Sequence, residues 1–325
     1  MNQASILFLK TTRKLYTKVF GSYQLPPLQR EENIDKISEI IYNLLINDKP
    51  CMIARFGAFE LATIVNYLGI IDSHHSIVKY IKGEQPEWWW NERIIKYMNT
   101  NAGFFPPTHE AITRFCKLMI ADTQQMDILC SWQKTELYLN KYFSQQIIKV
   151  NREKSNPFFA HNPWTRALKG KKILVVHPFA QSICKQYSNK KALFENHDLL
   201  PDFASLKVIK AVQSIGGSND GFKDWFDALN YMKGEINKCD FDICLIGCGA
   251  YGFPLAAHVK RLGKKAVHIG GTLQLYFGIK GKRWESQGYI GTDHDYSLLF
   301  NEHWIRPSET ETPQNNSNIE NGCYW

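Results

Sequence analysis

One segment of this 325-residue chain constrains its fold more than any other: a glycine-rich turn directly after a short apolar run. Residues 241–246 have the composition of a buried strand, and residues 247–252 spell Gly-x-Gly-x-x-Gly. Residues 252–262 then show helical apolar spacing, and residues 266–269 form another apolar run. This order predicts a parallel βαβ unit. The N-terminus of its helix would present free N–H groups and a positive dipole to a phosphate.

The same alternation runs through the rest of the chain. Further strands are predicted at residues 51–56, 126–131, 172–176 and 206–209. Helices are predicted at residues 33–46, 58–68, 86–98, 108–120, 134–143, 183–195 and 221–237. The sequence therefore predicts one α/β domain over residues 33–306, with a Rossmann-like, largely parallel sheet and helices on both faces. Ligands of such sheets bind beyond the carboxyl ends of the strands.

The two ends of the chain differ from this predicted domain. Residues 1–32 form a separate N-terminal segment, in which residues 4–20 mix apolar side chains with four basic ones. That mixture is typical of a basic amphipathic helix on a membrane surface, and equally of a first helix packed on the domain. Residues 307–325 are polar and predict a flexible C-terminal tail, in which residues 323–325 are the part that can dock on the body.

Composition limits the partners. The 39 basic and 31 acidic residues leave a net charge of +8, which suits anionic ligands such as nucleotide diphosphates and anionic membrane surfaces. Nucleic acid is not expected, because the chain has neither a dense basic block nor a recognisable nucleic-acid module. No CxxC pair, signal peptide or run of eighteen apolar residues is found. We therefore expect a cytoplasmic protein, with peripheral contact at the inner face of the cell membrane as an open alternative.

The residues at the end of the next predicted strand indicate which ligand to expect. A nicotinamide-binding fold places an acidic residue at the end of that strand, whereas here it ends in His268-Ile269-Gly270-Gly271. NAD is therefore not expected, and the second glycine pair favours a nucleotide lying across two neighbouring strand ends. The candidate binding residues of this region are Gly247, Gly249, Tyr251, Gly252, His268, Gly270 and Gly271.

Four further residues are candidates. His177 follows a predicted strand, where it would serve as a catalytic acid or base or simply close the strand as a packed histidine. Asn101, in a loop between two predicted helices, is a candidate sugar-binding residue. Lys282 and Arg283 lie on a loop bracketed by glycines and would face a diphosphate, or else form a solvated basic turn.

A resemblance sharpens this prediction. Residues 53–60, Ile-Ala-Arg-Phe-Gly-Ala-Phe-Glu, resemble the strand–turn–helix signature of GT-D-type glycosyltransferases, bacterial enzymes that transfer a sugar from a nucleotide sugar. That signature reads Arg, aromatic, Gly, Asp, Gly, Glu. The late glycine turn and residues 264–270 are similar to the second half of the family, so the resemblance covers roughly residues 35–290.

The resemblance implies a GT-D fold and transfer of a sugar from a nucleotide-diphosphate sugar to a surface polysaccharide, glycoconjugate or lipid-linked glycan. Arg55, Gly57 and Glu60 match the signature, whereas Ala58 and Phe59 replace its Asp and second Gly. Because the family's carboxylates handle the donor and its metal, Glu60 is the candidate ligand for Mn²⁺ or Mg²⁺. It would otherwise act as a general base without metal, or as a helix-start acid stabilised by the dipole.

Two other functions stay open at this point. One is another group transfer to polysaccharide, such as pyruvyl transfer, which would use the same basic and glycine positions. The other is a non-catalytic nucleotide-binding module, because the aspartate of the signature is replaced by Ala58.

Overall fold

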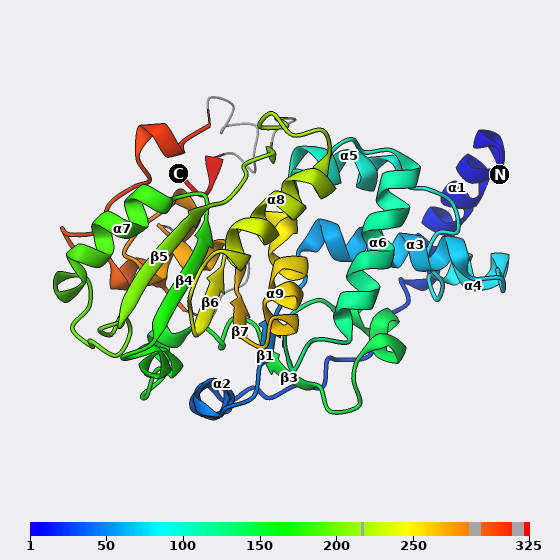
Figure 1. The fold of residues 1–325 in the computed structure, drawn as a ribbon. Helices are drawn as coiled ribbons and strands as arrows, with labels where there is room; N and C mark the ends of the chain where they lie inside the picture. Colours follow the sequence, from blue (N-terminus) through cyan, green and yellow to red (C-terminus); the bar gives the residue numbers. More distant parts are fainter. Residues whose placement is uncertain (216–217, 286–293, 314–321) are drawn as a thin grey trace.

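The computed structural model describes residues 1–215, 218–285, 294–313 and 322–325. Seven short strands form one sheet in the order β3-β2-β1-β7-β6-β4-β5, and every neighbouring pair is parallel (Figure 1). The strands are β1 (Cys51–Ala54), β2 (Ile128–Ser131), β3 (Ile148–Asn151), β4 (Lys172–His177), β5 (Ser205–Lys210), β6 (Ile243–Ile246) and β7 (Lys265–His268). The predicted Rossmann-like α/β fold is therefore confirmed.

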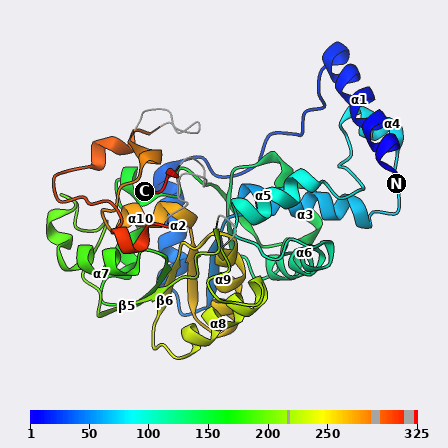
Figure 2. The ribbon, with the colours of Figure 1, turned by 90° about the horizontal axis from the view of Figure 1, so that it is seen from above.

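The α-helices are α1 (Gln3–Phe20), α2 (Ile34–Ile46), α3 (Ala58–Ile71), α4 (Ile77–Lys82), α5 (Glu92–Thr100), α6 (His109–Thr123), α7 (Ala180–Ser188), α8 (Trp225–Asn237), α9 (Gly252–Arg261) and α10 (Leu273–Tyr276). All α-helices except α1 and α4 contribute to the two cores that cover this sheet. Seen from above in Figure 2, α1 and α4 lie side by side at one end of the molecule, away from the sheet.

Successive residues of each strand enter two separate hydrophobic cores. In β1, Met52 and Ala54 pack in the core that contains α3, α5, α6, α8 and α9. Cys51 and Ile53 pack in the opposite core, with α2, α7 and α10. Because both faces of the sheet are covered, the central strands are apolar throughout, which is why they appear in the sequence as continuous apolar runs.

The helices that follow neighbouring strands lie on alternate faces of the sheet. Helices α3 and α9, after β1 and β6, contribute to one core, whereas α10 and α7, after β7 and β4, contribute to the other. Where consecutive strand ends send their chains to opposite faces, a crevice opens at the carboxyl edge. The β1–β7 contact also joins the first half of the chain to the last, so this crevice is built from distant segments.

Several local predictions were wrong. The helix predicted at residues 183–195 instead spans Ala180–Ser188. The helix predicted at residues 86–98 begins only at Glu92, because Asn91 caps it by accepting hydrogen bonds from the N–H groups of Arg93 and Ile94. Residues 134–142 form a 3₁₀ helix instead of an α-helix. Strand β3 was missed because, as an edge strand with only Val150 buried, it lacks a clear apolar run.

Both ends of the chain contact the body. The linker after α1 forms a parallel bridge between Glu31 and Val150. The described parts of the predicted tail are packed against the protein, with Glu311, Cys323 and Trp325 buried. Within the described residues, no helix combines the length and the apolar character needed to cross a bilayer.

Candidate active site

A cavity of about 430 Å³ lies at the carboxyl edge of the sheet, and three arginines from distant segments line it. Arg55 directly follows β1, and Arg152 directly follows β3. Arg283 lies in the short 3₁₀ helix Lys282–Trp284, beyond β7 and α10. The parallel sheet brings these three side chains together because all of its strands end at the same edge.

Arg55 crosses the turn that follows β7. Gly270 has φ +68°, and a Cβ atom built on it would lie 2.6 Å from Nη2 of Arg55, so the position needs glycine for both its backbone and its close contact. The Nη1 atom of Arg55 donates to the carbonyl oxygen of Phe56 at 3.3 Å. Its Nε atom is buried and has no hydrogen-bond partner among the described residues. Arg55 therefore retains an unused donor at the cavity.

Two arginines lie over the ring of Trp132. Its ring centroid lies 4.5 Å from the guanidinium carbon of Arg152 and 5.9 Å from that of Arg55. Its Nε1 atom donates to the carbonyl oxygen of Phe56 at 2.9 Å, which fixes the ring. Burial and then the positive charge of Arg55 lower the pKa of Arg152. Because arginine stays protonated, this arrangement concentrates positive charge and suits an anion with several oxygens.

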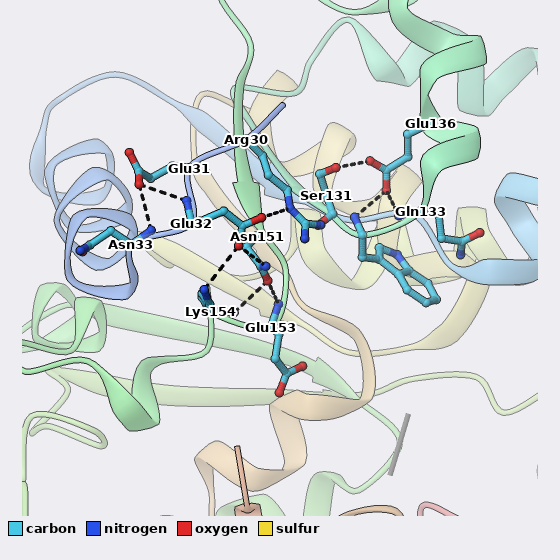
Figure 3. A network of polar contacts seen from close by, with 11 residues as sticks. Arg30, Glu31, Glu32, Asn33, Ser131, Gln133, Glu136, Asn151, Glu153 and Lys154 are labelled. Carbon is cyan, nitrogen blue, oxygen red and sulfur yellow. Dashed lines mark hydrogen bonds and ion pairs between the residues drawn. The ribbon is translucent and has the colours of Figure 1, made fainter. Parts of the chain in front are cut away.

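The loops after β2 and β3 are held by their own polar contacts (Figure 3). Glu136 accepts hydrogen bonds from the Ser131 hydroxyl at 2.5 Å and from the N–H groups of Trp132 and Gln133. After β3, Asn151 accepts from the N–H group of Glu153 at 2.9 Å. These contacts hold the backbone next to Trp132 and Arg152 in place. They therefore fix the points from which both side chains extend into the cavity.

The C-terminal residues close one side of the cavity. Nη1 of Arg283 donates to the Tyr324 hydroxyl at 2.7 Å. The Tyr324 ring lies against Gly271, where a Cβ atom would come within 2.4 Å of it. Gln274 donates to the carbonyl oxygen of Tyr324 at 3.1 Å. Tyr324 therefore borders the cavity beside the glycine turn that follows β7.

Two carboxylates line the same cavity as the arginines. Glu60, in the first turn of α3, is buried, and its carboxylate folds back over Gly57, where an added Cβ atom would lie 1.9 Å from Oε2. Glu153 accepts from the Tyr296 hydroxyl at 2.6 Å and lies 3.5 Å from Nη2 of Arg152. Both residues line the cavity.

The donor set was compared with what a divalent metal requires. In the part of the chain that the structure describes, no group of three His, Cys, Asp or Glu side chains is placed to share an ion. The cavity holds three arginines, and one of its two glutamates already pairs with Arg152. These residues do not fit a metal held by the protein alone. A divalent ion at Glu60, completed by donor phosphates, stays a prediction.

A smaller cavity of about 90 Å³ lies over the two glycine turns and is lined by Gly247, Gly249, Gly270 and Gly271. His177, Tyr324 and Trp325 also line it, and it shares Arg55 and Asn101 with the larger cavity. The two spaces therefore meet at the end of β1. Together they could hold an elongated ligand with its anionic part at the arginines.

His177 is buried at the end of β4. Its Nδ1 atom accepts a hydrogen bond from the N–H group of Phe179 at 3.0 Å, which places the ring proton on Nε2. Nε2 is buried without a partner among the described residues. Burial lowers the pKa of His177 to about 3. At neutral pH the ring is therefore an uncharged donor, and not an imidazolium that could supply a proton.

Some predicted ligand residues lie elsewhere. Tyr251 borders the smaller cavity, but its hydroxyl pairs with Ser214 at 2.7 Å and its ring stacks on Trp225. Gly252, His268 and Lys282 do not line either cavity. The ring of His268 packs directly over Gly252, the last glycine of the Gly-x-Gly-x-x-Gly turn. This glycine is therefore needed for close packing between α9 and β7. Burial, followed by the charge of Arg55, lowers the pKa of His268 to about 3.

The sequence did not identify several residues of the larger cavity: Trp132, Arg152, Glu153, Tyr296 and Tyr324. Trp132 could have been predicted as a cavity residue, because it directly follows the strand predicted at residues 126–131 and therefore lies at the carboxyl edge. Arg152 had the same signal, but it was hidden because β3 was not recognised. Tyr296 and Tyr324 reach the cavity only through the folding of the C-terminal segment, which has no local sequence signature.

Comparisons with known proteins add little to this geometry. No protein-family model and no curated protein matches the chain. Among solved structures, the chain is similar to one described as selenomethionine-substituted domain of unknown function 1792, with 11% identity and a TM-score of 0.33. The alignment covers 96% of this chain and 98% of that one. At this TM-score the similarity carries no argument about fold or function.

Proposed function

We propose that this protein is a glycosyltransferase that moves a sugar from a nucleotide-diphosphate sugar to a glycan or lipid-linked glycan acceptor. The observation that carries the proposal is the convergence of Arg55, Arg152 and Arg283 on one cavity at the carboxyl edge of a parallel sheet. Guanidinium groups bind phosphate oxygens bidentately, and three of them can contact both phosphates of a diphosphate. The resemblance of residues 53–60 to the GT-D signature supports the same class.

In this proposal each side chain has a distinct task. The arginines hold the diphosphate and offset the negative charge that grows on it as the bond between the anomeric carbon and the phosphate oxygen breaks. Trp132 offers an aromatic face beside them for the sugar or the base. The Glu60 carboxylate accepts the proton of the acceptor hydroxyl as that oxygen bonds to the anomeric carbon. His177, as a neutral N–H donor, binds rather than transfers a proton.

A ligand screen tests the binding half of this proposal. Thermal shifts are measured with uridine, guanosine, cytidine and thymidine diphosphates, and with NAD for comparison. A diphosphate at 100 times its dissociation constant should raise the free energy of unfolding by about 2.7 kcal/mol. Arg152→Met should weaken binding by roughly 10- to 100-fold, since it removes a charge-assisted contact. Arg93→Met, at an exposed arginine of α5 outside both cavities, is the matched control.

Turnover of a nucleotide-sugar panel, with and without Mn²⁺, tests the chemical half. Glu60→Gln should keep diphosphate affinity and lose transfer. If the native protein shows no turnover and Glu60→Gln leaves binding unchanged, the non-catalytic nucleotide-binding module becomes the better function. If no diphosphate binds at all, the assignment of the arginine cavity is refuted.

A further inference from the structure

Helix α1 carries charge of one sign only. Its four charged side chains are Lys10, Arg13, Lys14 and Lys18, and the first acidic residue of the chain is Glu31. The neighbouring helix α4 adds two lysines and no acidic residue. Among the described residues, Lys10 is the one basic side chain of α1 that forms an ion pair with the body, 3.3 Å from Glu87. The pair of helices therefore presents a basic surface.

The inner face of α1 is fully explained by packing. Ile6 and Leu9 lie in a small hydrophobic cluster with Tyr80 of α4 and with Trp89. Arg13 stacks on Tyr80, with its guanidinium carbon 4.9 Å from the ring centroid. These contacts hold α1 against α4, and they use one side of the helix.

The outer face of α1 carries a second set of large apolar side chains. Phe8, Leu15 and Val19 are 70%, 61% and 73% exposed. Their spacing of seven and four residues places them on one stripe of the helix, opposite Ile6 of the packed face. Scattered exposed apolar residues are ordinary, but a stripe of three on a helix whose other side is already packed is not. Helix α4 exposes two further large apolar side chains, Ile77 and Val78.

The charges decide between the possible occupants of this stripe. A second copy of the chain would bring its own lysines against Lys14 and Lys18, and like charges at an interface oppose association. An anionic lipid surface offers phosphates to the lysines and an apolar layer to Phe8, Leu15 and Val19. We propose that the outer face of α1, together with α4, lies on an anionic lipid bilayer. Both helices lie at one end of the molecule, away from the sheet (Figure 2), and the stripe on α1 is exposed.

A groove lies between α1 and the elements that carry the candidate active site. It has a volume of about 680 Å³ and is lined on one side by Lys10, Arg13 and Lys14 of α1. On the other side it is lined by Ala62 of α3, whose first turn lines the active-site cavity. Likewise Gln133 lines the groove and its neighbour Trp132 the cavity. If the proposed glycosyltransferase function holds, on which this step rests, a bilayer-bound protein would meet a lipid-linked acceptor on the side of the molecule where this groove lies.

Vesicle co-sedimentation of the full chain tests the membrane contact directly. Vesicles of phosphatidylcholine alone are compared with vesicles that contain roughly one-third phosphatidylglycerol, at low and high salt. The native chain should bind the anionic vesicles, and salt should weaken the binding. Phe8→Ser/Leu15→Ser/Val19→Ser should lower the bound fraction at least tenfold. So should Lys14→Glu/Lys18→Glu. Leu298→Ser, at a residue that is 80% exposed elsewhere, is the matched control and should bind like the native chain.

Other outcomes overturn the proposal. Equal vesicle binding by the triple serine variant would exclude the stripe as the contact. A concentration-dependent dimer that the same variant abolishes, without vesicle binding, would assign the stripe to a second copy. None of the changed side chains is buried, so all variants should fold. Chemical unfolding curves of each variant check this. Diphosphate binding by the triple variant should equal that of the native chain, so the membrane contact and the proposed function fail independently.

Discussion

At the scale of single residues, glycines determine where the functional side chains of this protein lie. Gly57 and Gly270 each leave a space that a charged side chain fills: the Glu60 carboxylate in one case and the Arg55 guanidinium in the other. In both cases the group in contact is the end of a flexible side chain. A methyl group at either position would therefore move the functional side chain before it disturbed the fold.

This contact predicts a separable effect of Gly270→Ala. The variant should lose about 1 kcal/mol of stability from its positive φ and, because Arg55 must move, bind diphosphates roughly tenfold more weakly. Gly170→Ala is a matched control, since Gly170 has the same φ of +68° and nothing within 4 Å of its added Cβ atom. It should lose similar stability in urea unfolding and keep its affinity in calorimetry. Equal affinity of both variants would contradict the role of Arg55.

Two buried histidines predict that the protein is sensitive to acid. The pKa values of His177 and His268 are about 3 in the fold, below the ordinary value near 6.5. The unfolded chain therefore binds more protons between these values, and stability falls as pH drops through this window. From about pH 7.5 to about pH 5.5, each histidine should remove about 1.4 kcal/mol from the free energy of unfolding.

His177→Asn tests this prediction, since an asparagine oxygen can still accept from the N–H group of Phe179. Urea unfolding at the two pH values should show a loss about 1.4 kcal/mol smaller than in the native chain. The exposed His74→Asn should leave the loss unchanged. A variant as sensitive to acid as the native protein would mean that His177 is not the cause.

At the scale of elements, the segment after residue 306 contributes a side chain that caps a helix from a distance. The Glu311 carboxylate accepts from the N–H groups of Gln181 and Ser182, and from the Ser182 hydroxyl, at the start of α7. These are the orphan donors of a helix N-terminus, and the carboxylate also interacts favourably with the helix dipole. Trp325 donates to the carbonyl oxygen of Glu311 and so connects the last residues to this cap.

Glu311→Ala should therefore lower the free energy of unfolding by about 1–3 kcal/mol, because it leaves buried N–H groups without an acceptor. The exposed Glu309→Ala should change it by less than about 0.5 kcal/mol. Chemical unfolding compares the two variants. A loss of the same size in both would show that general charge, and not the cap, is responsible.

At the scale of the whole molecule, the N-terminal segment has two parts with different roles. Helix α1 packs on its own small cluster, apart from the two cores of the sheet. Residues 30–32 instead support the edge of the sheet: Arg30 donates to the carbonyl oxygen of Ser131 at 2.5 Å, and Asn151 donates to Glu32 at 2.6 Å. These contacts adjoin Trp132 and Arg152, which directly follow β2 and β3.

Two truncations should separate these roles. Removal of residues 1–20 should shift the main thermal transition by no more than about 4 °C and leave diphosphate binding intact. Removal of residues 1–32 should weaken diphosphate binding at least tenfold, because the backbone before Arg152 loses its supports. Calorimetry with the best diphosphate of the screen measures both. Equal affinity of the two truncated chains would contradict the link between the linker and the site.

Much of the site could be anticipated from sequence where the signal is local. Arg55 and Gly270 follow clear apolar runs, and their positions after strands placed them correctly at the carboxyl edge. Arg152 could not be found in this way, because β3 is an edge strand with a weak pattern. His268 was misleading, since the same strand-end position can also direct a side chain into the core, where it packs on Gly252.

The sequence by itself determined the alternation of strands and helices, because burial on both faces of a parallel sheet requires continuous apolar runs and each covering helix requires its own period. Only the tertiary structure decided that β1 lies beside β7, and hence that Arg55, Arg152 and Arg283 share one cavity. The tertiary structure also decided which side of α1 is exposed and which side packs on α4. Periodicity is a local property of the chain, whereas strand order and the packing of helix faces depend on contacts between segments far apart in sequence.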